Sequence, residues 1–368
     1  MIYLDNAATT KPCDEVIKKA NEMMCNTWAN PSSLYSLGMY AEDEIELARE
    51  RVSGVLGVNP KNVVFTSGGT ESNNLAIHSA IKSTRHVGKK IIASAYEHSS
   101  VLEPLKELEK CGYEVVFLLP EKDGTISPDT LKNALTPDTA LVCVMLTNNE
   151  VGGVNDVKSM VEITKKTSPK AHFHCDCVAA FGKIKFSASA LGVDSLSVSA
   201  HKIHALKGTG ALYFKNNLKP LIVGGEQEKK LRGGTQNAVG IAAFGVACER
   251  LFKKNRAPEI KAHVLKWVES LDFVTLNADN DFSYITNVSV SKIKSETMLH
   301  FLESEGIFIS SGSACSKGQK SHVLKSLGLP ESQIDCAIRI SIDDTTTEND
   351  IDALFNAIKR AHEKLIKR

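Results

Sequence analysis

The sequence has no excess of charge of either sign, because 44 lysines and arginines face 43 aspartates and glutamates in 368 residues. With this balance we expect neither nucleic acid nor a membrane as a direct partner. No stretch approaches the roughly 20 apolar residues of a membrane-spanning helix. The N-terminus also lacks the basic and apolar segments of a secretory signal. The sequence therefore predicts a cytoplasmic protein.

The sequence also lacks the cysteine pattern of a disulfide framework. The chain has 9 cysteines, an odd number scattered along its length, which argues against structural disulfides. Internal repeats and low-complexity linkers are also missing. Hydrophobic residues make up 42% of the chain and charged residues 24%, the composition of an ordinary globular protein. The length favours one large and one smaller domain.

Between about residues 60 and 215, short apolar runs alternate with amphipathic stretches. Some runs are apolar throughout, such as LVCVML, which is typical of central strands covered on both faces. The fold class is therefore α/β, with a mainly parallel seven-stranded sheet whose ligands lie at the carboxyl ends of the strands. The predicted strands are 63–67, 90–95, 114–119, 141–147, 171–177, 195–200 and 211–214, with helices at 71–81, 101–110 and 157–166.

The pattern changes after a long helix predicted at 238–254. The strand-like runs are then ITNVSVSKI, IFISSGS and CAIRISI, separated by helices near 295–305 and 321–327. A final helix is expected to begin near Thr346 or Thr347, either of which is a suitable N-cap. We therefore predict a large domain at 12–255 and a smaller α+β domain at 256–368, with residues 1–11 packing against the smaller one.

The segment VVFTSGGTESNNLAI, at 63–77, predicts a strand, a glycine-containing turn and a helix that begins at about Thr70. Backbone N–H groups and hydroxyls at such a helix start form a cup for phosphate, and Gly68 and Gly69 allow an anion to approach closely. The alternative is an ordinary turn capped by Thr70. The turn has neither GK[ST] nor G-x-G-x-x-G, so P-loop and dinucleotide sites are poor interpretations.

The segment HFHCDCVAAFGK places Asp176 at the end of a buried strand, where a carboxylate needs a partner. A protonated ring nitrogen of a cofactor is one such partner. Two alternatives remain: a metal site from His174, Cys175, Asp176 and Cys177, or a polar strand end with two buried thiols. Strand alternation puts His174 and Asp176 on the face opposite the two cysteines, which disfavours a tetrahedral metal site.

The segment SLSVSAHKIHALKGTGALYF runs from an apolar strand directly into Ser199, His201 and Lys202. A lysine at a buried strand end can form a Schiff base with an aldehyde cofactor, whereas most lysines are solvated surface charges. Ser199 and His201 are positioned to add phosphate contacts.

Two further residues stand out in the last third of the chain. Cys315 follows a predicted strand and begins a polar loop with glycine and lysine, where a thiol can ionise and react; a partly buried thiol is the alternative. Arg339 lies inside the apolar run CAIRISI and therefore needs an anionic partner. That partner is either a substrate carboxylate or an internal salt bridge.

Taken together, these segments resemble the cysteine desulfurases of the class-V aminotransferase family, which have the type I fold of enzymes dependent on pyridoxal 5′-phosphate (PLP). The resemblance covers almost the whole chain, from YLDNAATT to Arg339 and TTTE. Its most specific pieces are TSGGTESNN, EHSSV, NNEVG, SAHK, RGGT and SSGSAC, in this order.

The resemblance implies roles for residues around PLP. Lys202 would attach the cofactor covalently, Asp176 would pair with the pyridine nitrogen, and His98 would stack on the ring and assist proton transfer. The phosphate would be held by Gly69, Thr70, Ser199 and His201.

The resemblance also implies partners. Thr235 would reach the phosphate of a neighbouring subunit, which implies a homodimer. Arg339 and Asn149 would bind the carboxylate of L-cysteine, and Cys315 would take its sulfur as a persulfide and release L-alanine. A sulfur-acceptor protein would then receive the sulfur for iron–sulfur clusters, thio-cofactors or tRNA thiolation. No metal is expected.

The chain departs from the family pattern at several positions. Ala179 replaces the usual glutamine that contacts the ring hydroxyl, and Asp343 replaces a glycine near the substrate arginine. Tyr35, Asn155 and the pair Ala205-Leu206 also differ from the pattern. Two alternative functions therefore stay open: a selenocysteine lyase or another class-V enzyme, and a non-catalytic scaffold in a sulfur-transfer complex.

Overall fold

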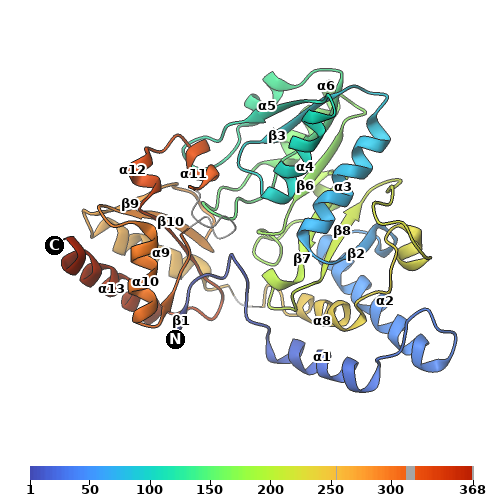
Figure 1. Ribbon diagram of the computed structural model, residues 1–368, viewed down its shortest axis with the longest axis horizontal. Helices are drawn as coiled ribbons and strands as arrows, with labels where there is room; N and C mark the ends of the chain where they lie inside the picture. Colours follow the sequence, from blue (N-terminus) through green and yellow to red (C-terminus); the bar gives the residue numbers. More distant parts are fainter. Residues whose placement is uncertain (254, 312–319, 367–368) are drawn as a thin grey trace.

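The computed structural model describes residues 1–253, 255–311 and 320–366 (Figure 1). Its largest sheet has seven strands in the order β2-β8-β7-β6-β5-β3-β4. Strand β8 is antiparallel to both of its neighbours, and the other neighbouring strands are parallel. The strands are β2 Val63–Thr66, β3 Lys90–Ser94, β4 Glu114–Leu118, β5 Thr139–Cys143, β6 His172–Asp176, β7 Ser195–Ser199 and β8 Gly210–Phe214.

Helices cover this sheet on both faces. Helices α3 (Gly69–Thr84) and α4 (Ser99–Lys110) form one hydrophobic cluster with Leu141 and Cys143 of β5. Val142, between them in sequence, belongs to another cluster with residues of α2, α6 and α8. The alternation of neighbouring side chains between two apolar layers explains why the strand reads as apolar throughout. The covering helices of the second layer are α2 Ser36–Leu56, α6 Val157–Thr167 and α8 Ala238–Cys248.

The C-terminal third forms a smaller antiparallel sheet with the order β12-β10-β9. Leu4 and Ala7 share one hydrophobic cluster with residues of this sheet and its helices. The N-terminal strand β1 (Ile2–Tyr3) pairs in parallel with β11 (Ile307–Phe308). The division of the chain at residue 256 stays a prediction. The elements are β9 Val274–Leu276, β10 Ile285–Val290, β12 Ala337–Ser341, α9 Ala257–Glu269, α10 Ser295–Ser304 and α13 Glu348–Ile366.

Figure 1 shows the N-terminal segment leaving the smaller sheet and crossing to the larger one before α1. This crossing brings residues 5–10 between the two sheets, beside the turn that follows β7, where Thr10 N donates to His201 O. Within the described ranges, no helix is long and apolar enough to cross a bilayer. The remaining elements are α1 Asp14–Asn26, α5 Pro128–Ala134, α7 Ala188–Leu191, α11 His322–Ser326, α12 Glu331–Ile334, η1 Pro60–Asn62, η2 Ala200–Lys202 and η3 Gln227–Lys230.

The sequence predicted the fold class correctly, two local predictions need correction, and two helices were missed. The helix predicted at 238–254 ends at Cys248, and the chain then turns. Phe252 has a φ of 62°, in the left-handed region, which is incompatible with a right-handed helix. In the described part of the run IFISSGS, residues 307–311, the strand is limited to Ile307–Phe308. Helices α1 and α2, together 34 residues, were not predicted. The final helix begins at Glu348, where Thr347 Oγ1 accepts from Asp350 N as an N-cap does.

Candidate active site

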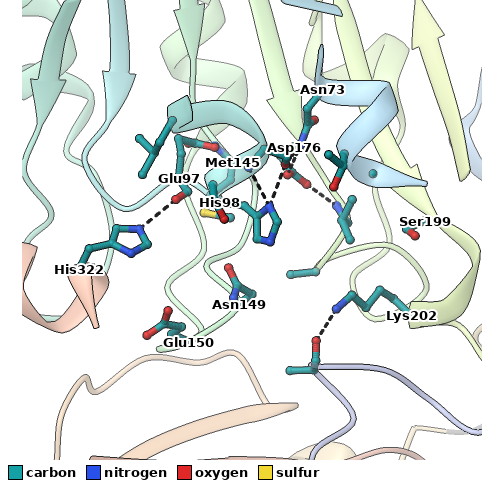
Figure 2. A pocket seen from close by; sticks show the side chains of 18 of the residues that line it. Asn73, Glu97, His98, Met145, Asn149, Glu150, Asp176, Ser199, Lys202 and His322 are labelled. Carbon is teal, nitrogen blue, oxygen red and sulfur yellow. Dashed lines mark hydrogen bonds between the residues drawn. The ribbon is translucent and has the colours of Figure 1, made fainter. Parts of the chain in front are cut away.

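A cavity of about 960 Å³ lies at the carboxyl ends of the central strands (Figure 2). Strand β6 contributes Asp176, the turn after β7 contributes Lys202, and the N-terminus of α4 contributes His98. Arg339 enters from β12 of the smaller sheet. Residues far apart in the chain thus meet where open parallel sheets bind ligands.

One end of the cavity has the features of a phosphate site. Helix α3 begins at Gly69, and a Cβ atom added there would lie 2.7 Å from Val178 Cγ2. The hydroxyl of Ser199 is buried and has no hydrogen-bond partner among the residues that the structure describes. Thr70, Ser199 and His201 line both the cavity and a smaller adjoining pocket of about 500 Å³. A helix start without room for a side chain and an unpaired buried donor suit an anion.

His201 is neutral at this end of the cavity. Burial, with the charges of Lys202, Lys207 and Lys183, lowers the pKa of His201 to about 4. Its Nδ1 lies 3.1 Å from Thr9 Oγ1, so the N-terminal segment helps to orient the ring. A neutral His201 can donate one hydrogen bond to an anion without adding a charge.

Lys202 lies at the end of η2, directly after β7, and Figure 2 shows its side chain reaching into the cavity. Its Nζ donates to Ala7 O at 2.6 Å and to Ala8 O at 2.8 Å. The lysine is therefore not a solvated surface charge. The sequence did not indicate that the N-terminal segment would supply these carbonyl groups.

Asp176 is the last residue of β6 and is 4% exposed. Its Oδ1 accepts from Val178 N at 2.8 Å, and its Oδ2 accepts from Asn73 Nδ2 at 2.7 Å. Both bonds stabilise the carboxylate and fix its orientation toward the cavity. A fixed carboxylate of this kind can hold a protonated ring nitrogen.

His98 occupies the N-cap of α4, beside Asp176. Its Nδ1 accepts from Ser100 N at 3.1 Å and lies 2.8 Å from Ser100 Oγ. Burial lowers the pKa of His98; Lys202 and His322 act in the same direction, whereas Asp176 acts against them. The cap therefore fixes the imidazole at the cavity wall, and its Nε2 bonds to none of the residues that the structure describes.

Arg339 makes the internal salt bridge, one of the two interpretations that the sequence left open, and the substrate carboxylate stays a prediction. The guanidinium is buried, and its Nη2 pairs with Asp5 Oδ1 at 2.7 Å, which is an internal salt bridge. Its Nη1 donates to Asn149 O at 2.8 Å. Its Nε has no partner among the described residues, and Arg339 and Asn149 both line the cavity.

Two acidic residues of the cavity wall were missed by the sequence analysis. Burial raises the pKa of Glu97 to about 8, and its Oε1 accepts from Ser94 Oγ at 2.5 Å and from Met145 N at 2.6 Å. Burial raises the pKa of Glu150 to about 7, and Ser321 Oγ donates to it at 2.5 Å. Their positions inside the motifs EHSSV and NNEVG were the only available signal.

Two basic residues of the wall were also missed. Burial, followed by the charges of Lys202 and Arg339, lowers the pKa of Lys183 to about 7. His322 begins α11, and its Nε2 donates to Glu97 O at 3.1 Å (Figure 2).

Strand alternation around Asp176 is as predicted. Cys175 and Cys177 share a face with their Sγ atoms 3.5 Å apart, and burial raises the pKa of both thiols. His174 bonds to Ser195 and Asn73 on the other face. Within the described ranges, no group of three or more His, Cys, Asp or Glu residues is arranged to hold a metal ion.

The remaining candidates lie outside the cavity of this chain or at its rim. Thr235 is exposed and does not line the cavity. Cys315 lies outside the described residues. Among the departures from the family pattern, Ala179 lines the cavity, whereas Asn155 bonds to Tyr96 in the core.

Known proteins match the chain along its length. The family model described as aminotransferase class-V matches residues 2–354. A Dictyoglomus turgidum protein named cysteine desulfurase IscS is 37% identical, covering 99% of this chain and 95% of its own. A solved structure described as a NifS-like protein has a TM-score of 0.93 and 32% identity, covering 98% of this chain and 99% of its own. Another solved structure, described as SspA in complex with cysteine, has a TM-score of 0.83 and 31% identity, and the match covers 94% of this chain and 100% of that one.

Proposed function

The chain belongs to the class-V aminotransferase family and, within it, to the PLP-dependent cysteine desulfurases, and we propose that its cavity is where sulfur is taken from L-cysteine. The observation that carries this assignment is the convergence of Lys202, Asp176 and Arg339 on one cavity. Two buried donors in it, Ser199 Oγ and Arg339 Nε, lack partners among the described residues. A cofactor phosphate and a substrate carboxylate would satisfy them.

The residues present fit PLP. When bound, the cofactor supplies an aldehyde for attachment to a lysine and a protonated ring that withdraws electrons from the substrate Cα. Lys202 would hold it covalently, Asp176 would face the ring nitrogen, and His98 would lie against the ring. The phosphate end would be formed by Gly69, Thr70, Ser199 and His201. The cavity volume of about 960 Å³ has room for a cofactor and an amino acid together.

The same geometry supports a division of labour in the reaction. Asp5 and Asn149 already fix the guanidinium of Arg339. Arg339 would bind the carboxylate of L-cysteine and orient the Cα–H of the substrate toward Lys202. Lys202 Nζ would take the Cα proton as a general base. The thiolate of Cys315 would attack the substrate Sγ: the Cβ–Sγ bond breaks, its electron pair remains on Cβ, and a proton completes the methyl group of L-alanine. The enzyme is left with a persulfide on Cys315.

The first test measures alanine formed from L-cysteine by the PLP-loaded protein with a reductant. We expect turnover in the wild type and loss of about 10²–10⁴-fold in Cys315→Ala, the scale of a missing nucleophile or proton carrier. Cys111→Ala, a change at an exposed free thiol, is the matched control and should retain activity. Equal alanine formation by both variants would remove Cys315 from the mechanism. No alanine from the wild type would refute the proposed reaction.

A second test addresses cofactor attachment. Borohydride reduction of the loaded protein should abolish its visible absorption and label Lys202, as identified by peptide mass mapping. Lys202→Ala should show neither effect, whereas Lys185→Ala, a change at an exposed lysine, should show both. A label on Lys183 would mean that this lysine of the same cavity, rather than Lys202, attaches the cofactor.

We also propose a homodimer, which rests on exposed apolar side chains. Trp28 is 71% exposed and Leu34 is 95% exposed, next to the start of α2, and Val223 is 83% exposed in the loop before Thr235. Surfaces of this kind are typical of interfaces. Light scattering should give twice the mass of one chain. Thr235→Ala should weaken PLP binding although Thr235 does not line its own cavity.

Two finer assignments complete the proposal. A sulfur-acceptor protein would receive the persulfide sulfur, because a thiol that returns to the reaction must be emptied after each turnover. The enzyme would work in the cytoplasm, since the eight cysteines that the structure describes are all free, as in reducing compartments.

A further inference from the structure

A continuous chain of hydrogen bonds runs through the core behind Asp176. Asn73 Nδ2 donates to Asp176 Oδ2 at 2.7 Å, and Asn73 Oδ1 lies 2.9 Å from His174 Nε2. His174 Nδ1 lies 2.8 Å from Ser195 Oγ, which in turn lies 2.7 Å from His172 Nε2. Asn73, His174 and Ser195 are buried, so water does not offer these atoms other partners. Figure 2 shows Asn73 between α3 and the carboxylate.

The donors and acceptors of this chain have one consistent assignment. An amide oxygen only accepts, so His174 Nε2 carries the hydrogen that Asn73 Oδ1 receives. Burial lowers the pKa of His174 to about 3, so the ring is neutral and its Nδ1 accepts from the Ser195 hydroxyl. Ser195 Oγ then accepts from His172 Nε2–H. Every hydrogen in the chain therefore points toward Asp176.

A second branch leads from Asn73 to His98. Asn73 Nδ2 also donates to Ser100 Oγ at 2.8 Å. The Ser100 hydroxyl, which accepts this hydrogen, is free to donate to His98 Nδ1 at 2.8 Å. The hydrogen of a neutral His98 is then on Nε2, the nitrogen that bonds to no described residue and belongs to a side chain of the cavity wall. One amide nitrogen thus contacts the carboxylate and, through one hydroxyl, the imidazole.

We propose that Asn73 is a positioning residue that locks Asp176 and His98 in one relative orientation, and that His174, held by Ser195 and His172, keeps the Asn73 amide from turning over. A turned amide would place its oxygen against Asp176 Oδ2, where two acceptors repel each other. The His174 N–H prevents this because it needs the amide oxygen as its acceptor. The inference rests on the proposed function, since it gives these two side chains a cofactor ring to hold.

Three variants interrupt the chain at increasing distance from Asp176. Asn73→Ala removes the amide that bonds to both Asp176 and Ser100. His174→Phe removes the N–H group that holds the Asn73 amide, and Ser195→Ala removes the hydroxyl that bonds to His174. Asn62→Ala is the matched control, because this side chain donates to Phe214 O and Lys215 O and makes no bond to any member of the chain. The graded series keeps the test usable if Asn73→Ala does not fold.

The main readout is the ¹⁵N chemical shift of the pyridine nitrogen of ¹⁵N-labelled PLP bound to each variant. We expect a protonated nitrogen in the wild type and in Asn62→Ala. The signal should move toward neutral pyridine in Asn73→Ala and His174→Phe and less in Ser195→Ala. In the same order, kcat should fall by up to about 10–100-fold, the equivalent of a lost hydrogen bond to a charged group. KM for cysteine should change little, because Arg339 and Asn149 lie outside the chain of bonds.

The result that overturns the inference is an unchanged pyridine signal with kcat within about twofold of the wild type in both Asn73→Ala and His174→Phe. Lower melting temperatures with an unchanged signal would also overturn it, since Asn73 would then be only structural. A failure of the proposed function is seen in the wild type, as missing alanine or missing cofactor. A failure of this inference is seen only in the variants.

Discussion

The two sides of the cavity differ in how their polar atoms are satisfied. Around Asp176, the carboxylate and the Asn73 amide are paired within the chain, by hydrogen bonds of 2.7–2.9 Å. At the two positions proposed for anions, the buried donors Ser199 Oγ and Arg339 Nε have no partner in the part of the chain that the structure describes. A buried donor without a partner costs about 1–3 kcal/mol.

This difference teaches which part of the site is completed by folding and which by ligands. The side that would contact a protonated ring needs a carboxylate with a fixed orientation. Hydrogen bonds within the protein can fix that orientation before the cofactor binds. The sides that would meet a phosphate and a substrate carboxylate need donors that stay available. Their unpaired state lowers the stability of the empty protein and raises affinity for the anion that pairs with them.

The largest effect is expected from breaking the paired side at its centre. Asp176→Asn keeps the shape but removes the negative charge, so the ring nitrogen would lose the group that keeps it protonated. We expect kcat for alanine formation to fall by about 10²–10³-fold, as when one preorganised electrostatic contact is removed. Turnover within about threefold of the wild type would contradict a catalytic role for this carboxylate.

A change at Glu97, also on the paired side, should be visible as a pH dependence of stability. The pKa of Glu97 is about 8 in the folded protein and 4.5 ordinarily, so the group is neutral when folded but ionises when unfolded. Its stabilising contribution is therefore full below about pH 4.5 and is lost as the pH rises to about 8, at about 1.4 kcal/mol for each pH unit.

Glu97→Gln cannot ionise and should not show this loss. Urea unfolding of the wild type and the variant at about pH 5 and about pH 8 measures the difference. The free energy of unfolding of the variant should rise relative to the wild type at the higher pH. A difference that is independent of pH would mean that Glu97 is ionised in the folded protein.

The unpaired side can be tested at Arg339. Arg339→Lys keeps the charge but loses the planar fork that Asp5 and Asn149 orient. We expect KM for L-cysteine to rise by about 10–100-fold, the equivalent of a charge-assisted hydrogen bond, with PLP affinity little changed. Arg360→Lys, a change at an exposed pair with Glu305, is the control. A change confined to kcat would assign Arg339 to the reaction step rather than to binding.

The smallest effect is expected at Ser199, and it tests most directly whether an unpaired donor serves a ligand. Ser197 and Ser199 both lie on β7 with buried hydroxyls that lack partners among the described residues, and Ser199 is the one that lines the cavity. Ser199→Ala should weaken PLP binding by about 2–10-fold, one neutral hydrogen bond, without lowering the stability of the empty protein. Ser197→Ala should leave PLP affinity unchanged. Equal effects on PLP affinity would mean that the unpaired hydroxyl of Ser199 does not serve a phosphate.

The sequence alone predicted the α/β class and all seven strands of the large sheet, because runs such as LVCVML carry a strong local signal. It failed where local patterns are weak or misleading. The helix predicted from residue 238 was extended past Cys248 to residue 254, but the positive φ of Phe252 shows that the backbone has already left the helix. Helices α1 and α2 were missed, although the buried residues Val16, Ala20 and Met23 of α1 recur at the spacing of an amphipathic helix.

The sequence by itself determined the chemical groups: a lysine and an aspartate at strand ends, a glycine turn before a helix, and an arginine in an apolar run. Only the tertiary structure decided which groups meet. Ala7 and Ala8 contact Lys202, Asp5 pairs with Arg339, and Asn73 holds Asp176 across 103 positions of the chain. Motif spacing reports local geometry, whereas these contacts depend on how two sheets and the N-terminal segment pack together. That packing is fixed by the burial of side chains from the whole chain at once, which no single segment encodes.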